Sequence, residues 1–269
     1  MITQQQWKLA WAFVMICGIT ANTFAFSGDP CGGESALLSI VDRPTVGDSA
    51  CVVPYNKAVL EFGYQYQKLR HSSADQQNFP EATVRIGLPY NNELVAVLPN
   101  YILQSSGPRS GFAASTLGIK HEIGYTDAWL AAIEGLVTLQ GGNSAFGRDG
   151  TGGALNAIVE YDFNPTWSLS FMFGVTSQVQ SQRDGGQRFT SFNPDLVLTY
   201  ALNPKINFYG EVYGQSKTGP GESSGFNADA GILYLLMPTV VLDLEVGQRI
   251  SGNLGGFNHY IGAGISIEC

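Results

Sequence analysis

The sequence predicts an all-β protein, an antiparallel transmembrane β-barrel of about 12 strands with meander topology. Apolar and polar residues alternate with a period of two, in stretches of about ten residues, from residue 57 onward. Charged residues make up only 13% of the chain, against about 25% in an ordinary soluble domain. Short and long connections also alternate along the chain. Together these observations favour a membrane barrel over a soluble fold.

Each alternating stretch places apolar side chains on one face of a strand and polar side chains on the other. In the first, KAVLEFGYQYQK, Leu60 and Phe62 fall on one face and Glu61 on the other. The third is less regular, and the facing of its residues stays open. The predicted strands are residues 57–68, 82–88, 93–103, 115–123, 129–139, 155–163, 167–176, 195–202, 206–215, 226–236, 240–249 and 259–269.

Two kinds of connection separate the strands. The tight ones are PYNN at 89, YTDA at 125, NPT at 164, NPK at 203 and MPT at 237. The longer ones, rich in Gly, Ser and charge, are residues 69–79, 104–111, 141–153, 180–188, 216–225 and 250–258. An even number of strands joined in this way brings both termini to one side, the periplasmic side. Because hydrocarbon offers no partner to an open sheet edge, the last strand must pair with the first.

Three features indicate that the apolar face is the outer, lipid-facing one. The strands have the ~9–11 residues that a tilted membrane strand needs, whereas globular strands average about 5–6. Isolated carboxylates stand in mid-strand on the other face, among Gly, Ser, Thr and Asn. Aromatic residues on the apolar face gather beside the tight turns, as in the girdle at a lipid–headgroup boundary. The predicted girdle residues are Trp129, Tyr161, Phe163, Trp167, Tyr200, Phe208 and Tyr234.

The polar face predicts a lumen with an acidic bias. A pore wall of this kind would favour cations and neutral polar solutes and would repel anions. In a second interpretation, which the sequence leaves open, Arg85, Lys120 and Arg249 neutralise neighbouring acids and help to fill the barrel. Three bases are too few to pair every acid, so some acids are expected to be solvated or protonated. The predicted lumen-lining residues are Glu61, Arg85, Lys120, Glu122, Glu134, Glu160, Asp162, Asp195, Glu211, Asp229, Asp243, Glu245 and Arg249.

The chain divides into three predicted parts. Residues 1–25 have the features of a signal peptide: Lys8, the apolar run LAWAFVMICGI and a small-x-small site ending at Ala25. Residues 26–56 form either a periplasmic lead-in that rests under the barrel or a plug that enters its lumen. Residues 57–269 form the barrel.

Cysteine usage fits an exported protein. Cys31 and Cys51 bracket a stretch that carries two Gly and a Pro and can fold back on itself, so we expect a disulfide between them. Closing that loop would stabilise the chain by roughly 3 kcal/mol. Cys269 is then left as a free thiol.

Composition and the histidines argue against several other classes. The net charge of −8 argues against binding to nucleic acid, whose phosphates need Lys and Arg. His71, His121 and His259 have no nucleophile motif beside them and are too scattered for a metal cluster. We therefore expect no enzyme activity, no metal and no cofactor.

Three stretches resemble an outer-membrane family labelled with the meta-pathway of phenol degradation. They are DRPTVGDSACVVPYNKAVLEFGYQYQ, NNELVAVLPNY and GGALNAIVEYDFNP, and the resemblance covers roughly residues 31–269. It implies a barrel in the outer membrane of a Gram-negative bacterium and, by association, an uptake channel for small compounds that include aromatic ones. The family pattern brings no active-site residues. Outer-membrane barrels usually end in an aromatic residue that the assembly machinery recognises, whereas Cys269 stands at that end here.

We therefore expect a passive outer-membrane channel or uptake pore for small solutes, with aromatic or hydrophobic compounds among them. Its expected partners are membrane lipid, the solute, and the barrel assembly machinery, through the C-terminal strand. A second hypothesis is a structural or adhesive barrel that does not conduct and displays its Gly/Ser-rich loops.

Overall fold

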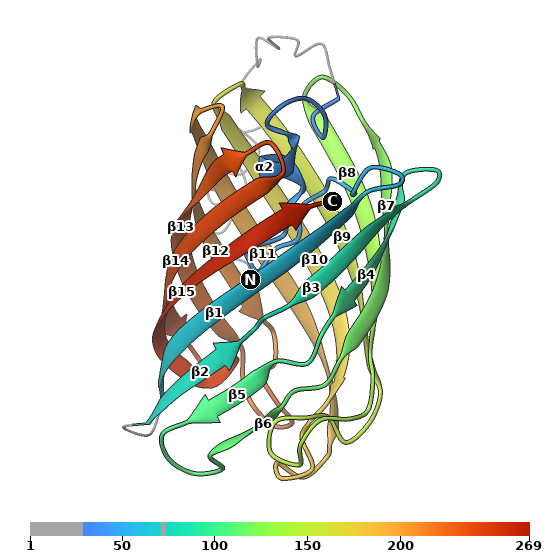
Figure 1. Cartoon of the computed structure of the whole chain (residues 1–269). Coiled ribbons are helices and arrows are strands. Elements are labelled where there is room, and N and C mark those ends of the chain that lie inside the picture. Colours follow the sequence, from blue (N-terminus) through green and yellow to red (C-terminus); the bar gives the residue numbers. More distant parts are fainter. Residues whose placement is uncertain (1–28, 71–73) are drawn as a thin grey trace, which may run out of the picture.

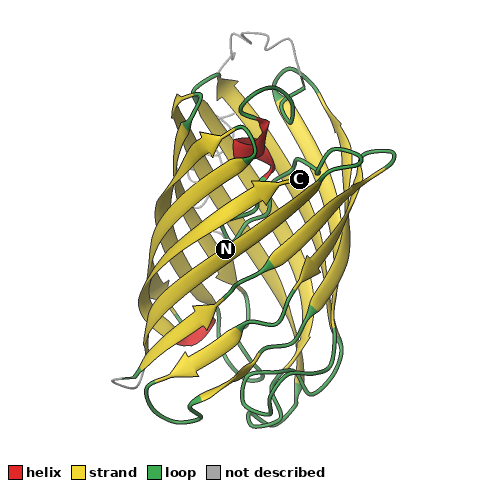
Figure 2. Ribbon diagram, in the orientation of Figure 1, coloured by secondary structure: helices red, strands yellow, loops and turns green. Residues whose placement is uncertain are grey.

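The computed structural model describes residues 29–70 and 74–269, and nearly all of them belong to one closed β-barrel (Figure 1, Figure 2). The predicted signal peptide and His71 lie outside the described residues. No described helix is long and apolar enough to cross a membrane.

The strands follow one another as antiparallel neighbours. Two short helical segments accompany them, α2 (Ala36–Ile40) and η2 (Leu254–Gly256). The strand segments are β1 (Ala58–Leu69), β2 (Asp75–Phe79), β3 (Thr83–Leu88), β4 (Asn92–Val97), β5 (Tyr101–Gln104), β6 (Ser110–Phe112), β7 (Thr116–Tyr125), β8 (Trp129–Thr138), β9 (Gly152–Asn164), β10 (Trp167–Val179), β11 (Arg188–Asn203), β12 (Ile206–Gln215), β13 (Gly225–Met237), β14 (Val240–Ser251) and β15 (Phe257–Glu268).

These 15 segments make 12 barrel strands, as predicted. β2 and β3 both pair with β1, so together they form one interrupted strand. β4 and β5 form the next one, because β4 pairs with β3 and β5 pairs with β2. β6 and β7 form the third, because β7 pairs with β4 and β6 pairs with β5. Pro80 and Pro99 lie in two of the interruptions, where a residue without an N–H cannot donate to the ladder.

The barrel closes where the first strand meets the last. β1 and β15 pair antiparallel from Val59 with Glu268 to Leu69 with Phe257, and Ala58 exchanges backbone hydrogen bonds with Cys269. Figure 1 shows the red β15 directly beside the blue-green β1. The predicted pairing of the first and last strands is confirmed.

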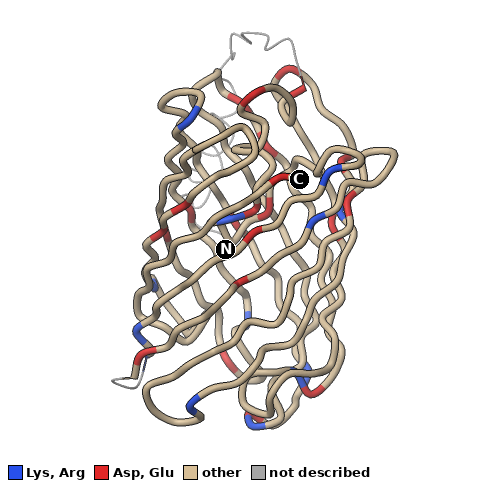
Figure 3. Tube along the Cα trace, in the orientation of Figure 1, with Lys and Arg blue, Asp and Glu red and all other residues tan. Residues whose placement is uncertain are grey.

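Along the strands, polar residues face the lumen and the apolar residues between them face outward. Lys120 and Glu134 are 0% and 1% exposed, whereas their strand neighbours Ile119 and Ile133 are 54% and 40% exposed. In Figure 3 the charged positions are spread thinly along the strands, between long runs of other residues. The uncertain third strand follows the same rule, because Glu93 is buried and Leu94 is exposed.

The girdle residues predicted from the sequence lie on the outer face beside the tight turns. Trp129 packs on Tyr161 across β8 and β9, with ring centroids 4.5 Å apart, and Trp167 packs on Tyr200 across β10 and β11 at 4.7 Å. Phe163, Phe208 and Tyr234 are exposed on the same face.

A second aromatic group lies on the outer face at the end with the long loops. Phe79, Tyr101 and Phe112 stand opposite one another on β2, β5 and β6, with centroids 5.4 and 5.1 Å apart. Sequence reasoning missed this group because it assigned all of 69–79 to a loop. That assignment is wrong, since β2 occupies Asp75–Phe79.

Candidate functional site

The barrel lumen holds a stretch of its own chain, residues 29–56, which we call the inserted segment. Its helix α2 lies at the end of the barrel with the tight turns (Figure 1), where the Ser35 hydroxyl donates to the carbonyl of Pro204 at 2.7 Å. A disulfide joins Cys31 to Cys51, as predicted, and Cys269 is an exposed free cysteine.

The apolar side chains of α2 pack against apolar side chains of the barrel interior. Leu37, Leu38, Ile40 and Val41 are buried in one cluster with interior residues of β8 to β14. These interior residues are Leu130, Ala132, Ile158, Met172, Val197, Tyr209, Leu233, Leu235 and Val241. They lie on the lumen-facing side of their strands, where the alternating pattern predicts polar residues and not large apolar ones. That departure from alternation was the available signal for an internal partner.

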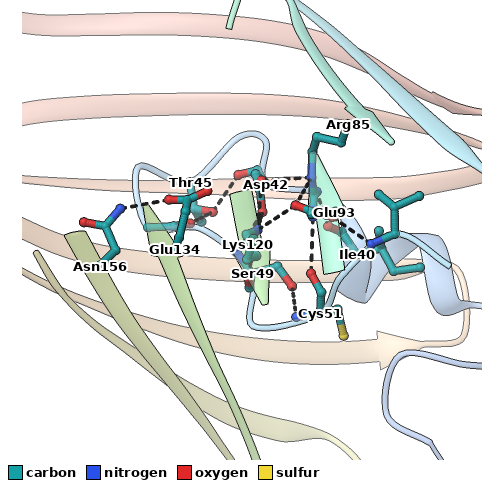
Figure 4. A network of polar contacts seen from close by, with 12 residues as sticks. Ile40, Asp42, Thr45, Ser49, Cys51, Arg85, Glu93, Lys120, Glu134 and Asn156 are labelled. Carbon is teal, nitrogen blue, oxygen red and sulfur yellow. Dashed lines mark hydrogen bonds and ion pairs between the residues drawn. The ribbon is translucent and has the colours of Figure 1, made fainter. Parts of the chain in front are cut away.

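Arg85 of β3 is the centre of a buried ionic network (Figure 4). Its guanidinium donates to both carboxylate oxygens of Glu93 at 2.9 and 3.0 Å and to Glu61 at 3.2 Å. It also donates to two carbonyls of the inserted segment, those of Ile40 and Cys51. Such a fork of donors suits paired carboxylates and carbonyls. Arg85 therefore joins the barrel wall to the segment.

Lys120 of β7 repeats this arrangement with a single ammonium. Its Nζ donates to both oxygens of Asp42 at 3.0 and 3.2 Å and to the carbonyl of Ser49 at 3.1 Å, and it lies 3.3 Å from Glu93. Asp42 also forms an ion pair with Arg85 at 3.2 Å. Sequence reasoning left the facing of Glu93 open and did not single out Asp42, so it could not identify the acids that neutralise these two bases.

Carboxylates of the wall also accept backbone N–H groups of the inserted segment. Glu61 accepts those of residues 42 and 43 at 3.2 and 2.9 Å. Glu93 accepts that of Val53 at 2.7 Å, and Glu211 accepts those of residues 46 and 47 at 3.0 and 2.7 Å. A segment without regular structure has unpaired N–H groups that need acceptors when buried. The acids of the lumen supply them.

Arg43 of the inserted segment supplies a positive charge that the sequence pattern did not reveal. Its guanidinium pairs with Glu81 at 3.0 Å and with Asp243 at 3.3 Å, and it lies 3.9 Å from Glu245. Burial alone would lower the pKa of Arg43, but the facing carboxylates raise it above its ordinary value. The segment thus adds a base to a lumen with an excess of acids.

A notch in the wall admits the Arg43 side chain. Gly63 of β1 and Gly264 of β15 pair directly opposite each other. A Cβ at Gly63 would collide with the Arg43 guanidinium, and one at Gly264 would come within 2.5 Å of Arg43 Nε. Glycine is needed at this point because a side chain of the inserted segment approaches the strands closely.

The tip of the inserted segment carries a further acid. Burial, and then the nearby carboxylates of Glu134 and Asp42, raise the pKa of Asp48 well above its ordinary value. Glu134 in turn accepts a hydrogen bond from the side chain of Asn156 at 2.9 Å. Asp48 also lines two of the cavities described below.

The remaining predicted lumen residues point inward but have other partners. Tyr260 donates to Asp229, and Arg249 donates to the carbonyl of Gly252 at 3.5 Å. Glu160 lines two of the cavities described below, and Asp195 lines the outer one. The sequence pattern therefore predicted that these residues face inward, whereas only the tertiary structure shows which residues they contact.

Three cavities lie in a row between the inserted segment and the wall formed by β8 to β12. The outer cavity, of 390 Å³, opens toward the long loops, and a middle cavity of 110 Å³ shares Asp48 with it. A third cavity of 170 Å³ near the tight turns shares Ser39 and Glu160 with the middle one. Shared lining residues make the three cavities neighbours along the length of the barrel.

The two histidines among the described residues, His121 and His259, take no part in this arrangement. His121 is exposed, and its Nδ1 lies 3.0 Å from the Asn92 side-chain oxygen, while His259 is exposed on β15. Within residues 29–70 and 74–269, no group of three or more His, Cys, Asp or Glu side chains could hold a metal ion.

A closed barrel with an apolar exterior, two aromatic bands and a polar interior is a membrane-spanning β-barrel of the outer-membrane class. The chain belongs to the family described as "Putative MetA-pathway of phenol degradation", whose model matches residues 41–267. The resemblance stated from the sequence is thereby confirmed.

Solved structures share this fold. The COG4313 outer membrane channel from Pseudomonas putida F1 aligns with a TM-score of 0.62 and 13% identity, over 84% of this chain and 100% of that chain. NanC porin aligns with a TM-score of 0.54 and 14% identity, over 78% and 98%. KdgM porin gives 0.54 and 7% over the same shares. At these identities the likeness is one of fold. No curated protein sequence matches the chain.

Proposed function

We propose that this protein is a passive channel for small solutes in the outer membrane of a Gram-negative bacterium, with aromatic or hydrophobic compounds among the solutes. The observation that carries the proposal is the row of cavities along β8 to β12, from the long loops to the tight turns. The family description and the porin-like fold support it. A barrel that served only as a scaffold would have no need of space along its length.

In this proposal the inserted segment narrows the lumen as a plug. Its ion pairs with β3, β7 and β14 and its hydrogen bonds with β1, β4 and β12 hold it in the lumen, and the cavities remain beside it. The disulfide between Cys31 and Cys51 shortens the free chain and keeps it compact. Asp42 is the acid of the inserted segment that both Arg85 and Lys120 contact, so its substitution should weaken the attachment of the segment to the wall.

Recording from planar bilayers tests the channel. The refolded full-length protein should give stepwise conductance, and a salt gradient should give a reversal potential of the sign for cation preference, because acids outnumber bases in the lumen. Asp42→Asn should raise the conductance, since it removes the partner of two buried bases. Glu34→Gln is the matched control, because Glu34 is an exposed acid of the same segment. Absence of conductance steps in both proteins would contradict the proposal.

A structural or adhesive barrel is the second candidate, and one observation favours it. The inserted segment lies in the lumen with its charged side chains paired to the wall, as a permanent filling would. This candidate predicts that bilayer recordings show no conductance steps for the unmodified protein and for Asp42→Asn alike.

We further propose that the assembly machinery recognises the C-terminal strand, and that the tight turns face the periplasm.

A further inference from the structure

The bases of the chain gather at the end of the barrel that carries the long loops. The long connections and the strand ends beside them hold eight Lys and Arg but only four Asp and Glu, whereas the rest of the chain holds six bases and 18 acids. Blue positions lie on these loops at the lower end in Figure 3. This end is therefore positive in an acidic protein. The eight bases, which we call the basic rim, are Lys68, Arg70, Arg109, Arg148, Arg183, Arg188, Lys217 and Arg249.

The bases of the rim differ from those of the lumen in their partners. Arg43, Arg85 and Lys120 of the lumen each contact at least two acids. Among the described residues, the only rim base that forms an ion pair is Lys68, which lies 2.5 Å from Asp75. The charges of the other seven are not compensated by a neighbouring acid, so this end of the barrel attracts anions.

Two rim bases meet at one carbonyl group in the loop between β14 and β15. The Arg249 guanidinium donates to the carbonyl of Gly252 at 3.5 Å, and the Arg70 guanidinium donates to the same oxygen. The backbone N–H of Arg70 also donates to the carbonyl of Gly256 at 2.8 Å, which holds the end of β1 against this loop. Two guanidinium groups that share one neutral acceptor repel each other. An anion beside them would relieve that repulsion.

Lys68 extends this corner onto the outer face of the barrel. It pairs with His259 of β15, which in turn pairs with Gln248 of β14, so the three polar side chains form one row across the strands. The side chain of Lys68 is 44% exposed, and its Nζ lies 5.5 Å from the centre of the Tyr66 ring. The row separates the apolar outer belt from the charged end of the barrel.

An apolar groove lies beside this row, on the same outer face. It has a volume of about 630 Å³, and Gln248 and His259 border it. The small side chains of Ala228 and Ala230 leave this space between larger neighbours. A groove that faces lipid suits an acyl chain, whereas a soluble anion gains nothing from apolar surface. The remaining outward-facing residues of the lining are Tyr66, Val246 and Ile261.

We propose that this corner binds an anionic membrane lipid, with its phosphate on Lys68 and Arg70 and one acyl chain in the groove. The charge of the rim selects the phosphate, and the groove selects a lipid over a soluble anion of the same charge. A zwitterionic lipid has the same chains, but the cation of its headgroup would meet the bases of the rim. The inference does not depend on conductance, because the site lies on the outer face of the barrel and not in the lumen.

Three probes separate the two parts of the site. Dioleoylphosphatidic acid has the negative charge and the chains, dioleoylphosphatidylcholine has the same chains without net charge, and glycerol 3-phosphate has the charge without the chains. Binding to the refolded full-length protein in detergent is measured by native mass spectrometry. Phosphatidic acid should bind at least about tenfold more tightly than phosphatidylcholine. Glycerol 3-phosphate at the same concentration should not displace it.

Two pairs of substitutions test the charges. Lys68→Gln/Arg70→Gln should bring the binding of phosphatidic acid to the level of phosphatidylcholine. Lys57→Gln/Lys205→Gln removes the same charge at the end with the tight turns and should change the binding of neither lipid.

One further pair tests the groove. Ala230→Leu should weaken the binding of phosphatidic acid at least about tenfold, because the larger side chain occupies the space of the acyl chain. Ala157→Leu, on the outer face of β9, is the matched control and should leave the binding unchanged.

Each outcome decides for or against the site. Equal binding of the two lipids, or equal losses in the two charge variants, would overturn it. Displacement by glycerol 3-phosphate would show a site for soluble phosphate and would overturn the assignment to a lipid. If Lys68→Gln/Arg70→Gln does not fold, the three probes on the unmodified protein and on Ala230→Leu still decide. A barrel without conductance steps that prefers phosphatidic acid contradicts the channel alone, whereas a conducting barrel without the preference contradicts the lipid site alone.

Discussion

At the scale of single residues, the lumen is stabilised by buried charges that compensate one another. Arg85 and Lys120 are both 0% exposed, and a buried base without its acids would cost far more than any surface charge. Asp42 and Glu93 contact both of them. Removing one member of this group leaves the others uncompensated, which makes the group sensitive to single substitutions.

Lys120→Met is predicted to destabilise the barrel by about 3–5 kcal/mol, because it leaves Asp42 and Glu93 with less positive charge in a buried site. Lys57→Met is the control. Lys57 pairs with Glu268 at 2.7 Å, but its side chain is 49% exposed, so its loss should cost at most about 1 kcal/mol. Urea unfolding of the two variants in detergent micelles measures the difference. Equal losses of unfolding free energy would contradict the role given to the buried network.

At the scale of elements, the inserted segment and the strands fit each other through small residues as well as through charges. The facing glycines Gly63 and Gly264 leave room for Arg43, which reaches Asp243 and Glu81 through the notch. Without a side chain that approaches this closely, a glycine in the interior of a strand would only weaken the strand. The position of these two glycines is therefore explained by the segment and not by the barrel.

Gly63→Ala should loosen the inserted segment while the barrel still forms. The added methyl group displaces the Arg43 guanidinium, and the loss of its charged contacts is worth about 1.5–3 kcal/mol. The disulfide, whose cysteines are 6% and 1% exposed, should then be reduced at least about tenfold faster by a water-soluble reductant. Mass spectrometry follows the reduction. Gly210→Ala is the control, since a Cβ there would meet nothing within 4 Å; the same rate in both variants would count against the notch.

At the scale of the whole molecule, two opposed environments are separated by one sheet. Large apolar side chains cover the outside, among them Leu244 at 56% and Ile261 at 54% exposure, while acids line the inside. Closure by β1 and β15 satisfies every edge of the sheet. The polar and charged side chains of this barrel therefore lie in the lumen, together with the inserted segment.

The outer belt makes a prediction that depends on depth. Leu244→Arg, in the middle of β14, should cost about 2–4 kcal/mol in lipid vesicles, whereas Leu202→Arg, beside a tight turn, should cost about 0–1 kcal/mol. Both side chains are exposed on the outer face, at 56% and 50%, so burial against protein does not distinguish them. Denaturant unfolding in vesicles gives the two values. A cost at Leu202 as large as that at Leu244 would argue that lipid does not cover this face as proposed.

Most of the barrel could be predicted from local pattern. Twelve strands, the pairing of first and last, the inward acids and the outer aromatic band near the tight turns all follow from alternation, which a strand imposes on neighbours in sequence. The strands at the long-loop end were harder to predict. There β2, β5 and β6 are short segments between interruptions, and no regular run of residues marks them.

The sequence by itself determined which side chains face inward, because the parity of a strand assigns every second residue to the lumen. Only the tertiary structure decided their partners. Asp42, Arg43 and Asp48 lie in a segment without periodicity, and their contacts join residues as far apart as Arg43 and Asp243. Local alternation specifies facing, whereas the pairing of charges depends on which distant stretches the closed barrel brings together.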